Sequence, residues 1–240
     1  MWANNAKAPP LITPTKREII GGLIYLPVHM FLLGLILAVL WIALGLDLSH
    51  LTQNIIYFTI STVVLITLCF DYLRRSFHAF LAFGWRNLPV CLQGYGIRFV
   101  LGIPVAVAIA AYAPSLQNPN QDAVVTLIAY DVIRTGLLAV ILAPIVEEIL
   151  FRGIVFAALC PKSRALAYLV STLLFGFLHV AAFLILNFSP GLFLTMAIYF
   201  PAGIALAWAY EKSGTVITPI VLHALMNGVA IALSSVGGVL

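Results

Sequence analysis

The sequence predicts an all-α protein, a polytopic bundle of transmembrane helices with about seven spans and a range of six to eight. The first observation is the composition: 63% of the 240 residues are hydrophobic and only 8% are charged. A soluble domain carries about 25% charged residues, so this composition argues against a soluble fold. The second is a mean hydropathy of +1.11. The third is that apolar residues form runs of roughly 20, the length that crosses the hydrocarbon layer.

Seven such runs follow one another along the chain. They cover about residues 19–46, 54–70, 96–113, 129–159, 164–187, 191–210 and 215–236. The first is long enough to tilt or bend near Pro27, and the fourth has its membrane core near 137–159. Residues 71–95 mix charged and aromatic side chains, a pattern that predicts an interfacial amphipathic segment. Residues 114–122 are rich in Pro and Asn, which predicts turns in an outer loop.

The chain is expected to form one transmembrane domain behind a polar start. Residues 1–18 predict a cytoplasmic N-terminal arm, and residues 19–240 predict the transmembrane domain, with a motif-bearing core at 137–228. The apolar run that follows the arm is too long for the core of a cleavable signal peptide. It is therefore expected to remain as the first helix.

The basic residues predict the orientation in the membrane. Of the twelve Lys and Arg, ten fall on the side of the N-terminus when the predicted loops are counted, Arg98 among them, and none falls in a predicted outer loop. By the positive-inside rule, the protein is expected to be a multi-pass protein of the plasma (inner) membrane with a cytoplasmic N-terminus. The basic residues form no run, so the expected partner is the lipid bilayer and not nucleic acid.

Three ionisable residues interrupt the apolar run at 137–160: Glu147, Glu148 and Arg152. An ionisable group at bilayer depth costs a few kcal/mol, so it usually faces a protein interior or a wet cavity. Glu148 precedes Arg152 by four residues, the better orientation for an ion pair on one helix face. Glu147 lies roughly 140° around the helix from Arg152. One acid is therefore expected to be structural and the other free for chemistry.

Two later spans carry further polar side chains. His179 lies in the fifth span, and His223 and Asn227 lie in the seventh, four residues apart and on one helix face. At about 1.5 Å per residue, these three and Glu147 fall at similar depths in the middle of the layer. We expect the four side chains to share one cavity.

Other polar and aromatic residues are expected to be structural. His29 and the pair Asp131 and Arg134 are assigned to packing, with Arg134 as the partner of Asp131. Aromatic residues such as Tyr199 and Tyr210 are expected to pack or to lie near the membrane interfaces.

Taken in order, the motifs resemble those of a known family. They are Glu147-Glu148 with Arg152, Phe175 with His179, and His223 with Asn227. They are similar to the motifs of the CPBP family, the CAAX prenyl protease-like intramembrane endopeptidases, also called type II CAAX or Abi proteases. The resemblance covers about residues 137–228. It implies a conical helical bundle with catalytic groups in a membrane cavity, and substrates that are membrane-anchored, prenylated or sorted polypeptides.

The chemistry of the groups suggests a role for each. Peptide hydrolysis needs an activated water, and a carboxylate removed from bulk water is a stronger base. Glu147 is the candidate general base, and His179 would hold or polarise the water. His223 and Asn227 are candidate hydrogen-bond donors to the oxyanion of the tetrahedral intermediate.

Glu148 and Arg152 would brace this site and complete the set of candidate catalytic residues. No cofactor is needed for this mechanism.

Three alternatives remain open. The first is a zinc-dependent membrane protease with Glu147, Glu148, His179 and His223 as ligands, which are residue types that zinc accepts, although Arg152 would compete with the cation. The second is a transport protein, which predicts inverted repeats, whereas the polar groups are confined to the C-terminal half. The third is a non-catalytic immunity or scaffold protein.

Overall fold

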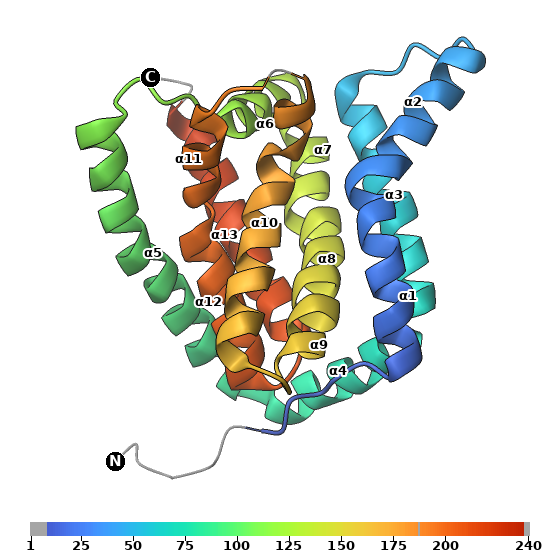
Figure 1. The fold of residues 1–240 in the computed structure, drawn as a ribbon, viewed down its shortest axis with the longest axis vertical. Coiled ribbons are helices and arrows are strands. Elements are labelled where there is room, and N and C mark those ends of the chain that lie inside the picture. The colour runs from blue at the N-terminus through green and yellow to red at the C-terminus, as the bar shows by residue number, and fades with distance from the viewer. Residues whose placement is uncertain (1–8, 187, 238–240) are drawn as a thin grey trace.

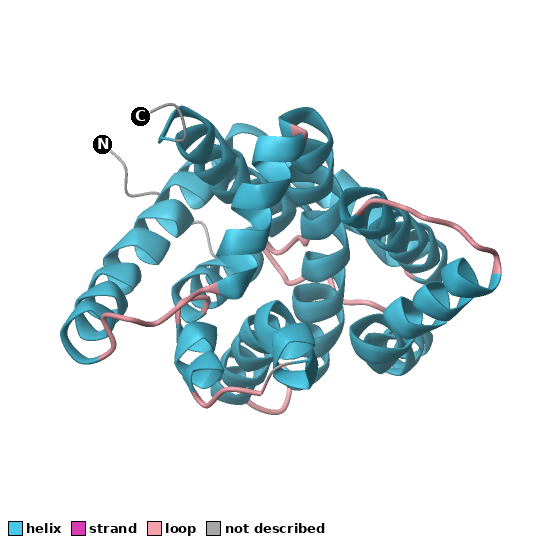
Figure 2. Cartoon of the chain, turned by 90° about the horizontal axis from the view of Figure 1, so that it is seen from above, coloured by secondary structure: helices cyan, strands magenta, loops and turns pink. Residues whose placement is uncertain are grey.

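The computed structural model is a bundle of helices and describes residues 9–186 and 188–237 (Figure 1). Within these residues no strand occurs, and the helices stand side by side with the loops at their ends (Figure 2). Six helical segments are long and apolar enough to cross a membrane. They are Lys16–Ala43, His50–Leu68, Phe70–Tyr112, Arg164–Leu186, Gly191–Ser213 and Ile217–Ser235. The predicted polytopic helical bundle is confirmed.

The first span is one helical run, α1 (Lys16–Pro27), a π-helical turn η1 (Val28–Leu32) and α2 (Leu33–Ala43). The irregularity expected near Pro27 is this π-helical turn. A capping box begins α1: the Thr15 hydroxyl accepts from the Glu18 N–H, and the Glu18 carboxylate accepts from the Thr15 N–H. The helix therefore starts inside the expected polar arm. The chain returns through α3 (His50–Leu68).

The next helix, α4 (Phe70–Phe83), lies across one end of the bundle, as expected for an amphipathic segment (Figure 1). Gly84, at φ 56°, then turns the chain through η2 (Gly84–Arg86) into α5 (Asn87–Tyr112). The predicted segment was too long, because Asn87 is buried and accepts from Thr218 at 2.7 Å, so α5 begins before the apolar run. Arg98, expected near the inner end of the span 96–113, consequently lies roughly 16 Å along α5.

The fourth predicted span, 129–159, is divided at Asp131. Before it, α6 (Pro119–Tyr130) begins with Pro119 in its first turn, so the expected turn segment is partly helical. The carboxylate of Asp131 caps the next helix by accepting from the Arg134 N–H at 2.9 Å. The Arg134 guanidinium donates instead to Thr52 Oγ1 at 2.8 Å, so the expected pairing of the two charges is wrong.

From Asp131 the chain is helical without a break. The run contains α7 (Val132–Gly136), η3 (Leu137–Leu142), α8 (Ala143–Glu148), η4 (Ile149–Phe156) and α9 (Ala157–Leu159). The segments η3 and η4 are π-helical, and such turns frequently occur at functional sites. Every residue of η4 is buried, so this run forms the core of the bundle.

The remaining helices are α10 (Arg164–Leu186), α11 (Gly191–Ala197), α12 (Phe200–Ser213) and α13 (Ile217–Gly237). The sixth predicted span thus consists of two helices. They separate because Pro201, in the first turn of α12, has no N–H to donate to the preceding turn.

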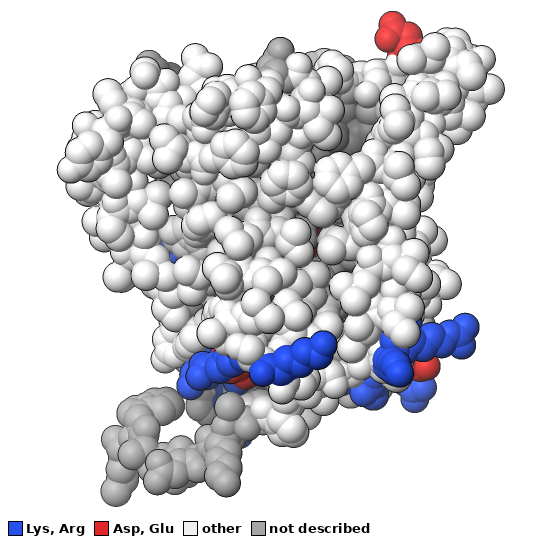
Figure 3. Space-filling model, viewed as in Figure 1, with Lys and Arg blue, Asp and Glu red and all other residues white. Residues whose placement is uncertain are grey.

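Charged side chains mark one end of the molecule. On the face seen in Figure 3, Lys and Arg gather near the end where α4 lies, and the sides are almost free of charge. The uncharged sides agree with a bundle surrounded by lipid. The cytoplasmic placement of the basic end stays a prediction.

Candidate active site

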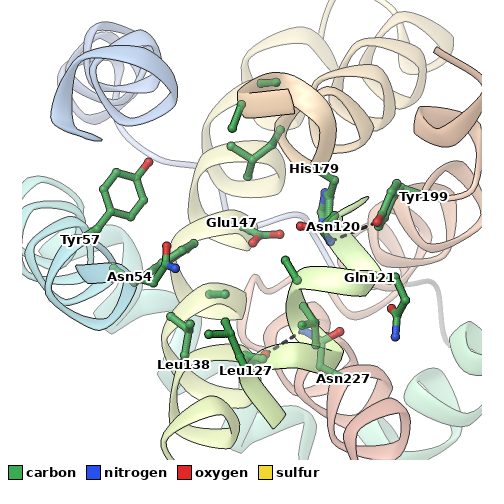
Figure 4. Close-up of a pocket in the computed structure, with 18 of the residues that line it drawn as sticks. Asn54, Tyr57, Asn120, Gln121, Leu127, Leu138, Glu147, His179, Tyr199 and Asn227 are labelled. Atoms are coloured by element: carbon green, nitrogen blue, oxygen red, sulfur yellow. Dashed lines mark hydrogen bonds between the residues drawn. The ribbon is translucent and has the colours of Figure 1, made fainter. Parts of the chain in front are cut away.

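A cavity of about 700 Å³ lies inside the bundle. Glu147 of α8, His179 of α10, and His223 and Asn227 of α13 all line it (Figure 4). The four side chains that were expected to share a cavity are thus brought together, in agreement with their similar depths. Glu148 and Arg152 are not in contact with this space, because both are fully buried behind its wall.

Glu147 is the carboxylate that remains free. Its side chain is 6% exposed and makes no hydrogen bond or ion pair with the described residues, and its Oε2 is buried without a partner. Figure 4 shows the carboxylate pointing into the cavity, toward His179 and Asn120. A buried carboxylate without a cation is costly, so this group is suited to bind a water or a polar substrate atom.

Glu148 is instead engaged through one oxygen, and the pairing with Arg152 follows the helix spacing; its Oε2 is buried without a partner among the described residues. Its Oε1 accepts from Arg152 Nη1 at 2.9 Å and lies 2.8 Å from His223 Nδ1. Because an ionised carboxylate only accepts, Nδ1 of His223 carries the hydrogen in this contact. The arrangement fixes the ring of His223 and leaves its Nε2 free of protein partners among the described residues.

Arg152 connects this ion pair to two other helices. Its Nη2 donates to the Gly203 carbonyl of α12 at 2.9 Å, and its guanidinium lies 4.6 Å from the ring centroid of Phe175 on α10. The Phe175 ring also contacts the rings of His179 at 4.8 Å and His223 at 5.6 Å. Phe175 is therefore the apolar side chain around which the motif residues assemble.

His179 has a defined tautomer. Its Nδ1 lies 2.8 Å from the Phe175 carbonyl oxygen, and a carbonyl only accepts, so Nδ1 carries the hydrogen. Its Nε2 is then available to accept from a group in the cavity. The ring stacks on Tyr199, with centroids 4.1 Å apart and planes 26° apart.

Asn227 anchors α13 to an irregular turn of the fourth run. In η3 the Ala143 N–H bonds to Leu138 O, and Pro144 has no N–H, so the Ala139 carbonyl loses both possible helical donors. Asn227 Nδ2 donates to that carbonyl at 2.7 Å. One of the two amide hydrogens expected to serve an oxyanion is therefore already used, and one remains.

His29 is buried, as expected of a structural residue, but it also lines the cavity. Its Nδ1 lies 3.0 Å from Ser61 Oγ. In η1 the Leu33 N–H bonds to Val28 O, which leaves the His29 carbonyl free, and the Tyr57 hydroxyl donates to it. An N-terminal helix thus contributes a polar wall opposite the motif helices.

Several lining residues were not singled out from the sequence. They are Asn54, Tyr57, Asn118, Asn120, Gln121 and Tyr199. Three amide side chains between 118 and 121, at the start of an apolar run, are a signal that could have found part of this set. They were assigned to turns, and Tyr199 was expected to pack or to lie near a membrane interface.

The zinc alternative can be tested against the donor groups. Nowhere in residues 9–186 and 188–237 do three or more His, Cys, Asp or Glu side chains form a group that could hold a metal ion. Glu148 contacts Arg152 and His223 and does not line the cavity that Glu147 faces. The residues present do not fit a zinc site, and no catalytic step is assigned to a metal.

Comparisons with known proteins give the family. Residues 130–229 match the family of type II CAAX prenyl endopeptidase Rce1-like proteins. The membrane-embedded CAAX protease MroQ of Staphylococcus aureus (strain USA300) is 23% identical over 145 residues, 59% of this chain and 56% of MroQ. A 24.3 kDa protein of Escherichia coli, named as uncharacterized, is 30% identical over 182 residues, 71% of this chain and 77% of that protein.

The match thus spans little more than half the length of MroQ. No solved structure matches this chain. All six candidate catalytic residues singled out from the sequence lie within the matched residues 130–229. Residues 130–229 thus resemble the Rce1-like type II CAAX prenyl endopeptidase family, and the rest of the chain lies outside that match.

Proposed function

We propose that this protein is an intramembrane endopeptidase in which Glu147 activates the water that hydrolyses a peptide bond. The observation that carries the proposal is the contrast between two adjacent acids. Glu148 is held by Arg152 and His223, whereas Glu147 faces a cavity of about 700 Å³ with no protein partner. A free carboxylate in such a cavity is suited to general-base catalysis.

The reaction needs only the groups of this chain and water. Glu147 takes a proton from the water while the water oxygen adds to the carbonyl carbon of the peptide. This addition gives a tetrahedral oxyanion. His179, which accepts through Nε2, holds the second hydrogen of the water and orients it. The C–N bond then breaks as the Glu147 carboxyl group returns its proton to the leaving amine.

The oxyanion requires hydrogen-bond donors at the cavity wall. The remaining amide hydrogen of Asn227 is one candidate, since the other is used by Ala139. His223 can donate through Nε2 when both ring nitrogens are protonated. Glu148 and Arg152 act as positioning residues, because Glu148 fixes the ring of His223 from behind the wall.

We propose a membrane-anchored or lipid-modified polypeptide as the substrate. The cavity lies among helices whose outer faces are apolar, and its lining includes apolar side chains such as Phe31, Leu37 and Trp41. The relative MroQ is named a CAAX protease, which makes prenylated peptides the first substrates to test. The proposed location is the plasma (inner) membrane, with the N-terminus and the basic end in the cytoplasm.

The test is cleavage of membrane-tethered peptides, prenylated and unmodified, by the purified protein in nanodiscs. Glu147→Gln is expected to lower kcat by on the order of 10³-fold, because an amide cannot take the proton. His179→Ala is expected to lower kcat by about 10²-fold. The matched control is Glu211→Gln, since Glu211 pairs with Arg164 and neither residue lines the cavity; it is expected to keep activity within about twofold.

The same assay separates this mechanism from the zinc alternative. Incubation with a chelator is expected to leave the activity unchanged. Activity that is lost with chelator and restored by zinc would contradict the glutamate mechanism. Full activity of Glu147→Gln would contradict the proposed role of that residue. The protease assignment would be refuted if the wild type cleaved none of the peptides and the Glu147→Gln variant functioned normally in cells.

A further inference from the structure

We propose that Tyr199 is a positioning residue that holds the ring of His179 in its working orientation, and that the outer loop at 117–120 in turn holds Tyr199. The inference rests on the proposed function, because it assigns Tyr199 a role through the water-orienting His179. Figure 4 shows Tyr199, Asn120 and His179 on the same side of the cavity, with Glu147 facing them.

The need for such a residue follows from how His179 is bound. One hydrogen bond, from Nδ1 to the Phe175 carbonyl at 2.8 Å, fixes the tautomer. A single hydrogen bond leaves the tilt of the ring plane open. Tyr199 supplies the missing constraint, because its ring lies 4.1 Å from the His179 centroid at 26°. Offset stacking of this kind restricts the ring plane, so Nε2 is kept directed at the cavity.

Tyr199 is itself fixed through its hydroxyl. The hydroxyl donates to Asn118 Oδ1 at 3.0 Å and accepts from Asn120 Nδ2 at 3.1 Å. The same Asn118 oxygen caps α6 by accepting from the Gln121 N–H at 3.2 Å. Thr195 also donates to the Gln117 carbonyl at 3.0 Å, which ties the loop to α11. The loop and the tyrosine therefore form one hydrogen-bonded unit.

The local sequence explains why the tyrosine points inward. Pro201 ends the hydrogen-bond pattern between α11 and α12, and Tyr199 lies at this break, directly before α12. The first turn of α12 also presents the Gly203 carbonyl to Arg152. One short segment thus contacts both the water-orienting histidine and the buried ion pair, which couples the two halves of the site.

A tyrosine that only anchors a helix at a membrane interface would leave its hydroxyl to water or lipid headgroups. Here two asparagine side chains of the protein satisfy the hydroxyl, and the ring contacts a motif residue. These contacts distinguish a positioning role from a membrane anchor.

The experiment compares Tyr199→Leu, which removes ring and hydroxyl, with Tyr199→Phe, which keeps the stacking ring. Cleavage is measured per folded molecule in nanodiscs. Tyr199→Leu is expected to lower kcat by about 10- to 100-fold with KM within about twofold, because a misplacement of about 1 Å costs on the order of 10²-fold. Tyr199→Phe is expected to retain most of the activity, with a loss of about two- to tenfold.

The matched controls are Tyr168→Leu and Tyr168→Phe. Tyr168 also lies in a hydrogen bond and a ring contact, to Glu211 and Phe156, but outside the cavity. Both controls are expected to change kcat by less than about twofold per folded molecule. They measure the effect on kcat of removing a tyrosine whose hydrogen bond and ring contact lie outside the cavity.

A second readout does not depend on activity. In protein labelled with 15N-histidine, the His179 signals are identified by their loss in His179→Ala. The wild type is expected to give one tautomer with the hydrogen on Nδ1, Tyr199→Leu a broadened or split signal, and Tyr168→Leu the wild-type signal. If the wild type cleaves but Tyr199→Leu matches Tyr168→Leu in kcat and spectrum, the positioning role is wrong and the proposed function stands. If no peptide is cleaved, the proposed function fails, and the spectra alone decide the positioning.

Discussion

Replacement of Arg152 by Met tests the buried ion network most directly. The change keeps a long side chain but removes the 2.9 Å ion pair with Glu148, the 2.9 Å hydrogen bond to Gly203 and the contact over Phe175. Both ion-pair side chains are 0% exposed, so water cannot replace the lost partner. Removing one member of a buried pair costs about 3–5 kcal/mol, and we expect a loss of stability in this range.

A double-mutant cycle separates the pair from the packing. Glu148→Gln is also expected to destabilise the protein, because it leaves the Arg152 charge buried without a counter-charge. The double variant buries neither charge, so its loss should fall below the sum of the single losses by about 2–3 kcal/mol. Stability is measured by reversible unfolding in mixed micelles, followed by tryptophan fluorescence.

The control pair has the same residue types in a different setting. Arg164 and Glu211 are 2.6 Å apart, but the Arg164 side chain is 67% exposed. Exposed pairs contribute about 0–1 kcal/mol, so Arg164→Met should cost no more than this. The reasoning that burial gives the ion pair its stabilising effect would be refuted by either of two results. The two Arg→Met variants could lose equal stability, or the losses of stability in the Glu148–Arg152 cycle could be strictly additive.

Two further substitutions test other contacts of the site by the same unfolding measurement. Gly203→Ala would place a Cβ 2.9 Å from Thr172 Cγ2, and this variant is expected to lose about 1–3 kcal/mol of stability. The control is Gly102→Ala, whose new Cβ meets nothing within 4 Å and which should be neutral or slightly stabilising. Equal stabilities of the two variants would contradict the close packing of α10 and α12. Asn227→Ala leaves the Ala139 carbonyl without a donor and should cost about 1–3 kcal/mol, while a change below about 0.5 kcal/mol would mean that the carbonyl finds another partner.

The motif residues could be found from the sequence because charge is rare in a membrane-spanning chain. Glu147, Glu148 and Arg152 were conspicuous in an apolar run, and the four-residue spacing predicted the ion pair that the structure contains. Depth along the helices was enough to predict that His179 and His223 would reach the same cavity. Helical rise is regular, so counting residues gives depth without knowledge of packing.

The ends of the helices and the outer wall of the cavity could not be predicted in this way. Hydropathy reports where lipid can contact the chain, but Asn87 begins α5 because Thr218, on another helix, satisfies its side chain. Asn120 and Tyr199 are 79 residues apart in the sequence. Each alone is an ordinary loop or interface residue, and only their contact places them in the site.

The π-helical turns show that a polar group on one helix is satisfied by a side chain on another, and they explain how the walls of the cavity are held together. A π-helical turn frees a backbone carbonyl, and lipid has no hydrogen-bond donor to satisfy it. Two freed carbonyls, those of His29 and Ala139, accept from Tyr57 and Asn227 on other helices. Each bond therefore fixes one wall of the cavity to another. Asn227 consequently has a structural role in addition to its proposed role at the oxyanion. A variant without Asn227 should therefore lose stability and activity together.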